Sequence, residues 1–213
     1  MCWNAEVSLI TFITSLCMCI YLWYRNLQND RPISLWIFTF SLIQLFEFFM
    51  WLDINNTKGW NNLATKISLP FILLQPFVLS VSIWYYKIHY NNEYIKLLLY
   101  LLIGISGIRA ILAFIYIIIN NKKWISKPGK NCHLVWYFMK DKLPYLIDFN
   151  FMYKYSLILL LLMIKPFHEG LFYLLFGVIT ILISQYIYGL EMGSIWCWIA
   201  NVLGIYAIGC KMF

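Results

Sequence analysis

Six strongly polar side chains interrupt the apolar stretches of this 213-residue chain, and they are the residues that could do chemistry there: Gln44, Glu47, Gln75, Arg109, Gln185 and Asn201. Polar groups are expensive inside hydrocarbon, so such positions are candidates for function. Glu47 is the only acid and Arg109 the only base deep within these stretches. Opposite charges that pair cost much less than either charge alone. We therefore expect Glu47 and Arg109 to face each other, with the other four side chains completing the hydrogen bonds.

This cluster is compatible with three roles. It could bind or pass a small solute or ion, or it could supply Glu47 as the acid or base of an intramembrane enzyme. It could also only hold helices together, because a buried polar contact in a membrane contributes about 0.6–2 kcal/mol. We take a non-enzymatic protein that binds a small solute or ion at the cluster as the leading interpretation, and the other roles stay open.

Several familiar activities lack the residues they need. His89 and His168 fall on one side of the predicted membrane and His133 on the other, so a metal-dependent or serine hydrolase would have no histidine at bilayer depth. No phosphate-binding glycine motif occurs. The six cysteines include no C-x-x-C pair and predict neither a disulfide framework nor a zinc site. We expect no metal and no cofactor. The net charge of +7 comes without a nucleic-acid-binding motif, so we expect no nucleic-acid partner.

The elements that position the cluster are predicted to be membrane-spanning helices. Hydrophobic residues make up 62% of the chain and charged residues 12%, against about 25% charged in soluble domains. Apolar runs of about 20 residues match the length that crosses ~30 Å of hydrocarbon as a helix. The sequence therefore predicts an all-α polytopic helical bundle in the lipid bilayer, built as one transmembrane domain with seven spans: 7–24, 33–52, 67–86, 95–119, 148–164, 171–190 and 194–210.

These spans place the polar residues at one depth. We call the side that holds the amino terminus side A and the opposite side B. Glu47, Arg109 and Gln185 each follow the start of a span that rises from side B by 14 residues, or about 21 Å. Gln75 and Asn201 lie in spans of opposite direction, about 18–20 Å from side B. The five spans thus predict a shared polar layer.

The ends of the spans give further expectations. Trp51, Trp196 and Trp198 are predicted to anchor helices at the membrane interface. The segment from Cys132 to Leu146 mixes aromatic and basic residues and is predicted to lie in the interface plane. Side A carries eight lysines and side B six basic residues, but Arg25 and Arg31 follow the first span on side B. These two signals disagree, so the sequence leaves the orientation open, and the oligomeric state as well.

Two motifs carry a resemblance. Gln44-x-x-Glu47-x-x-x-Trp51 and Ser194-x-Trp196-Cys197-x-x-x-Asn201, in a chain rich in Asn, Ile, Lys and Tyr, resemble uncharacterised multi-pass membrane proteins of giant DNA viruses and some microbes. The resemblance implies a host or virion membrane as the location and implies no activity. It also adds a structural or scaffolding protein of a viral or organelle membrane to the alternatives.

Overall fold

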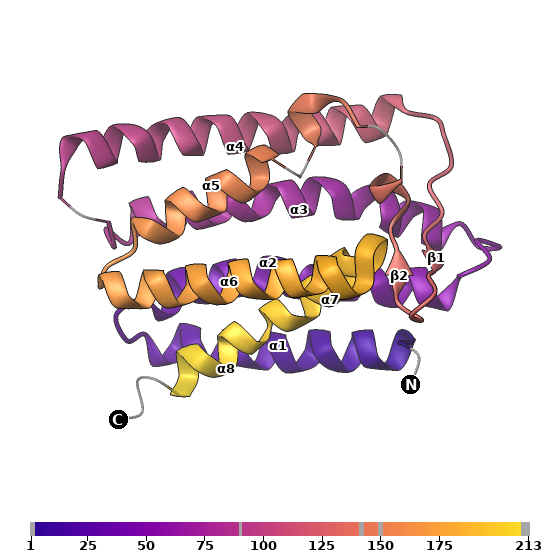
Figure 1. Ribbon diagram of the computed structural model, residues 1–213, viewed down its shortest axis with the longest axis horizontal. Helices are drawn as coiled ribbons and strands as arrows, with labels where there is room; N and C mark the ends of the chain where they lie inside the picture. Colours follow the sequence, from indigo (N-terminus) through magenta and orange to yellow (C-terminus); the bar gives the residue numbers. More distant parts are fainter. Residues whose placement is uncertain (1–2, 90, 141–142, 149–150, 210–213) are drawn as a thin grey trace.

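Helices dominate the structure, a computed structural model that describes residues 3–89, 91–140, 143–148 and 151–209 (Figure 1). The all-α prediction is confirmed. The helices are α1 (Ala5–Arg25), α2 (Asp30–Leu52), α3 (Trp60–Tyr85), α4 (Glu93–Ile119), α5 (Phe151–Leu162), α6 (Phe167–Tyr188), α7 (Met192–Ala200) and α8 (Val202–Gly209). Two short strands, β1 (Lys127–Pro128) and β2 (Leu134–Val135), and three turns of 3-10 helix at Tyr137–Met139, Tyr145–Ile147 and Gly189–Glu191 complete the described part.

Within the described residues, six elements are long and apolar enough to cross a membrane: α1, α2, α3, α4, the segment Tyr145–Leu162, and the segment Phe167–Gly209. The last segment has 43 residues and is not one straight helix. The chain reverses at Gly189–Glu191, so that α7 returns beside α6, and α8 then continues against α1 and α2 (Figure 1). Within the described residues, every range that the sequence predicted as a span overlaps one of these helices or the pair α7 and α8.

The bundle is apolar on its outside as well as in its core. The most apolar window of α2 and of α3 is 61% buried, whereas that of α4 is 28% buried. The outward face of α4 presents Ile108, Ile111, Ile115 and Ile118, each between 46% and 76% exposed. A soluble protein rarely exposes such a continuous apolar face. This surface is what a membrane protein presents to lipid, which agrees with the six candidate spans.

Arg25 closes the side-B end of the bundle. Its Nε donates to the carboxylate of Asp30 at 2.7 Å, which fixes the turn between α1 and α2. Its two Nη groups donate to the carbonyl oxygens of Ala207 at 2.7 Å and Ile208 at 2.9 Å. The last carbonyls of a helix have no partner within the helix, and a cation there is favourable. One arginine therefore joins the turn to the end of α8.

A folded cap covers side A where the sequence suggested only a loop. Residues 120–139 form it, with β1 and β2 paired antiparallel. Asn61 of α3 binds Ser126 in both directions: its amide donates to the Ser126 carbonyl at 3.0 Å, and its Oδ1 accepts from the Ser126 N–H at 2.9 Å. Trp124 is fully buried between the cap and the helices. The segment Cys132–Leu146, predicted to lie in the interface plane, begins in this cap, and its described end at Tyr145–Leu146 lies against α4. Its position relative to the interface stays a prediction.

Glu191, in the turn between α6 and α7, holds the tip of the cap. Its buried carboxylate accepts from the backbone N–H groups of Asn131 at 3.0 Å and His133 at 3.1 Å. A Cβ at Gly129 would lie 2.2 Å from Glu191 Oε1, so only glycine permits this approach. Burial lowers the pKa of the His133 imidazole, and the neighbouring Glu191 carboxylate opposes that shift. The cap and the α6–α7 turn thus form one unit.

The cysteines depart from the prediction in one place. Cys132 is disulfide-bonded, whereas Cys17, Cys19 and Cys197 are free. The expectation that the cysteine pattern holds no disulfide is therefore wrong for Cys132. The backbone N–H of Trp3 also donates to the carbonyl oxygen of Cys132 at 3.1 Å, which attaches the start of the chain to the cap.

Candidate functional site: a polar cluster beside an apolar cavity

Glu47 is fully buried in α2 and its partners are all neutral. The amide of Gln44, one helical turn earlier, donates to Oε2 at 3.2 Å. The indole N–H of Trp136, which follows β2, donates to Oε1 at 2.9 Å. The hydroxyl of Ser194 in α7 also lies beside this carboxylate but outside hydrogen-bonding geometry. Glu47 therefore joins α2 to the cap segment and to the start of α7.

Trp136 reaches Glu47 because of a glycine in α7. A Cβ at Gly193 would lie 2.5 Å from the ring of Trp136, so a larger residue would push the indole away. Trp136 was not predicted as a partner of Glu47, because an aromatic residue in a segment of mixed aromatic and basic composition is typical of the membrane interface. Its indole N–H, a donor that needs a partner when buried, was the available signal.

Arg109 does not pair with Glu47, so the predicted ion pair is wrong. Its Nε donates to the carbonyl oxygen of Leu146 at 2.8 Å, and its Nη2 donates to the carbonyl oxygen of Asp148. These carbonyls belong to the short 3-10 helix Tyr145–Ile147 and to the residue that follows it, which lie beside α4. Arg109 itself lies ten residues before the end of α4 at Ile119, about 15 Å along the helix axis. Irregular backbone at membrane depth needs partners within the protein. The guanidinium supplies them, because the helix that would otherwise satisfy these carbonyls begins only at α5.

The remaining predicted residues have separate surroundings. Gln75 accepts a hydrogen bond from the hydroxyl of Tyr153 in α5. The amide of Asn201 donates to the carbonyls of Cys197 at 3.0 Å and Trp198 at 3.2 Å, where α7 gives way to α8. Gln185 is exposed on α6. Of the six residues expected to form one layer, only Gln44 and Glu47 are hydrogen-bonded to each other.

The three tryptophans predicted as anchors also differ among themselves. Trp51 is partly buried against the core in the last turn of α2. Trp198 is 39% exposed and packs edge-on against Trp3, with ring centroids 5.4 Å apart. Trp196 is partly buried and packs against two rings of the bundle, with centroids 5.4 Å from Phe40 and 6.2 Å from Tyr153. It lines a cavity.

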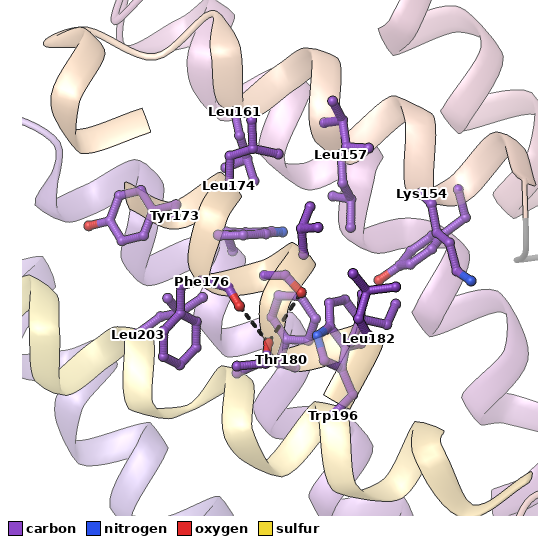
Figure 2. Close-up of a pocket in the computed structure, with 18 of the residues that line it drawn as sticks. Lys154, Leu157, Leu161, Tyr173, Leu174, Phe176, Thr180, Leu182, Trp196 and Leu203 are labelled. Atoms are coloured by element: carbon purple, nitrogen blue, oxygen red, sulfur yellow. Dashed lines mark hydrogen bonds between the residues drawn. The ribbon is translucent and has the colours of Figure 1, made fainter. Parts of the chain in front are cut away.

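This cavity has a volume of about 190 Å³ and lies between α5, α6, α2 and the α7–α8 segment (Figure 2). Its walls are mostly apolar and aromatic, and they include Trp36, Leu157, Tyr173, Phe176, Trp196 and Leu203. Lys154 lies at one end and Tyr173 at the other (Figure 2). Gln185 also lines it. A Cβ at Gly177, a further lining residue, would meet no atom within 4 Å, so the cavity has room beside α6.

Tyr153 and Trp196 stand between the cavity and the polar cluster. Both also line a second, smaller cavity of about 20 Å³, which extends to Trp136 and Cys197. Tyr153 has a double role: its ring faces the cavity and its hydroxyl binds Gln75. Glu47 lines neither cavity. The open space is therefore next to the polar cluster and not within it.

Among the described residues, no three His, Cys, Asp or Glu side chains lie close enough together to hold a metal ion. Comparison with family models, with curated proteins and with solved structures finds no match to this chain. The geometry of the cluster and the cavity is thus the basis for a functional proposal.

The separate partners of Glu47 and Arg109 predict additive effects on stability. Glu47→Ala leaves the Trp136 indole without an acceptor, and Arg109→Leu leaves two carbonyls without donors, so each should cost about 1–3 kcal/mol. In a double-mutant cycle measured by unfolding in detergent, the two costs should add to within about 0.5 kcal/mol. Glu47→Gln keeps an acceptor oxygen and serves as the milder control. A rescue of Glu47→Ala by Arg109→Leu would show that the two charges do pair.

Proposed function

We propose that this chain is a multi-pass membrane protein that binds a lipid-like small molecule in the cavity between α5 and α6. The supporting observation is the cavity itself: about 190 Å³, mostly apolar and aromatic, and set among helices apolar enough to span a membrane. Cavities with apolar walls and a few polar groups are the usual form of small-molecule sites. A ligand that enters from the bilayer is itself largely apolar, so it would pack against such walls without losing hydrogen bonds to water.

The two ends of the cavity favour an amphipathic ligand. Lys154 and Gln185 supply polarity at one end, and Lys154 has no ion-pair partner among the described residues. Tyr173 lies at the other end and is separated from Gln185 by about 18 Å along α6. That length is close to half of the ~30 Å hydrocarbon core, or one leaflet. We propose a single apolar chain along the cavity, with a polar or anionic group near Lys154.

The proposed ligand site lies in the cavity between α5 and α6, whereas the sequence predicted a site at the polar cluster around Glu47. A small solute or ion at Glu47 would need space beside that carboxylate, and both cavities are lined without it. The same geometry gives an enzyme based on Glu47 no support. The alternative of a structural or scaffolding protein in a viral or organelle membrane is supported only by the resemblance of the two sequence motifs. The same is true of a location in a host or virion membrane.

We also propose seven crossings. α6 has 22 residues, or about 33 Å, and the stretch from Met192 to Gly209 covers about 27 Å. Each is close to the ~30 Å of a hydrocarbon core. The turn at Gly189–Glu191 would then lie on side A, where Glu191 holds the cap.

Side A is proposed to face an oxidising compartment. Disulfides persist in such compartments and are rare where thiols are kept reduced, and Cys132 of the side-A cap is disulfide-bonded. The arginines after the first span agree with this orientation, since Arg25 and Arg31 lie on side B and basic residues favour the cytoplasmic side, whereas the eight lysines of side A favour the opposite one.

Filling the cavity tests the function. Gly177→Leu places a side chain in open space, whereas Gly104→Leu, on the exposed face of α4, makes the same change where a Cβ also meets nothing within 4 Å. The probe is a diazirine-bearing fatty acid, photo-crosslinked to protein in nanodiscs and mapped by mass spectrometry. Crosslinks to cavity residues should fall about tenfold in Gly177→Leu, which corresponds to a loss of ~1.4 kcal/mol in binding free energy. They should persist in Gly104→Leu. Equal crosslinking in both variants would contradict the proposal.

The orientation is tested with one introduced cysteine on each side. Lys58→Cys lies in the exposed side-A turn between α2 and α3, and Lys87→Cys lies in the exposed side-B turn between α3 and α4. In intact cells with the protein at the surface, a membrane-impermeant maleimide should label Lys58→Cys, and Lys87→Cys only after permeabilisation. The reverse pattern would place side A in the cytosol.

A further inference from the structure

A cleft of about 690 Å³ lies at the side-B end of the bundle, away from the cavity described above, and the two share no lining residue. It is formed by the end of α3, the turn that follows, the first turns of α4, and the connection between α5 and α6. Its lining includes Trp84, Tyr85, Lys87, Lys96, Tyr100 and Lys165.

Backbone contacts fix the shape of this cleft. His89 forms a β-bridge with Ile164, and the N–H of Lys165 donates to the carbonyl oxygen of Ile88 at 2.8 Å. These contacts join the α3–α4 turn to the α5–α6 connection, although the two are far apart in sequence. Lys87 and Lys165 are therefore brought to one cleft by the fold and not by proximity along the chain.

The charges that line the cleft have one sign. Three lysines take part, and no acidic side chain among the described residues belongs to its lining. Among the described residues, Glu93 binds one of these lysines, at 2.8 Å from Lys96 Nζ, and its own side chain is 85% exposed. The cleft therefore attracts an anion. Basic pockets between the ends of membrane helices are a known form of site for anionic lipid headgroups.

The aromatic residues place the cleft at the level of headgroups. Trp84, Tyr85 and Tyr100 are 45%, 68% and 54% exposed, and the Trp84 indole donates to the Tyr100 hydroxyl at 3.3 Å. Exposed Trp and Tyr at the ends of apolar helices lie at the membrane–water interface, where lipid phosphates are found. We propose that this side-B cleft binds the phosphate of an anionic phospholipid headgroup through Lys87, Lys96 and Lys165. This site is independent of the proposed function, because it uses other residues on the opposite side of the membrane.

The test compares two triple variants of the full chain. One is Lys87→Gln, Lys96→Gln and Lys165→Gln in the cleft, and the control is Lys122→Gln, Lys123→Gln and Lys127→Gln on the exposed side-A cap. Native mass spectrometry measures the binding of phosphatidylglycerol and phosphatidylcholine to each. The wild-type protein should prefer phosphatidylglycerol. In the cleft variant, the ratio of phosphatidylglycerol binding to phosphatidylcholine binding should fall roughly fivefold for each lysine replaced. The control triple should keep the wild-type ratio.

Other results would overturn the proposal. An equal loss in both triple variants would mean that general surface charge, and not the cleft, causes the preference. A wild-type protein that binds both lipids equally would contradict the proposed site. Inorganic pyrophosphate serves as a water-soluble probe: lysine-dependent binding of pyrophosphate without a preference for phosphatidylglycerol would assign the cleft to a soluble anion instead. Thermal unfolding in phosphatidylcholine nanodiscs checks the fold. If the triple variant unfolds, the single variant Lys87→Gln in an exposed turn carries the same test.

Discussion

The structure depends on one constraint: a polar group inside the bilayer must find its partner within the protein, because lipid offers none. Two arginines show how this chain meets it. Arg25 donates to the last carbonyls of α8, and Arg109 donates to the carbonyls of Leu146 and Asp148. In both places the cation serves backbone that has no helical partner. Arg109 thereby satisfies the backbone that precedes α5, and α5 itself, with 12 residues, is shorter than a helix that crosses ~30 Å of hydrocarbon.

The same constraint connects the cap, the polar cluster and the cavity. The cap is held by Glu191, and the segment that leaves it carries Trp136 to Glu47. The chain then passes Arg109 and enters α5, where Tyr153 binds Gln75 with its hydroxyl and lines the cavity with its ring. A ligand in the cavity would touch Tyr153 and Trp196, which are the residues that separate it from the cluster. Glu47 and its partners Gln44 and Trp136 thus lie outside the proposed site.

Much of the fold could be predicted from the sequence, because apolar runs and their charged flanks determine helices in a membrane. The pairing of Gln44 with Glu47 also follows from their spacing on one helix. The partners of Arg109 could not be predicted, since main-chain carbonyls carry no side-chain signal and become available only where a helix is absent. The same holds for Trp136 and for the disulfide of Cys132, which depend on how the cap folds back onto the bundle. Gln185 was misplaced because depth along a helix says nothing about which face the residue occupies.

The distance from the Arg109 guanidinium to two possible partners tests this account most directly. Solid-state NMR of the protein in lipid, with ¹⁵N in arginine side chains and ¹³C in either the Leu146 carbonyl or the Glu47 carboxyl, measures both distances. Here the guanidinium nitrogen should lie within about 4 Å of the Leu146 carbonyl carbon, as a hydrogen bond requires, with no comparable contact to Glu47. Strong coupling to the Glu47 carboxyl and none to Leu146 would contradict the account.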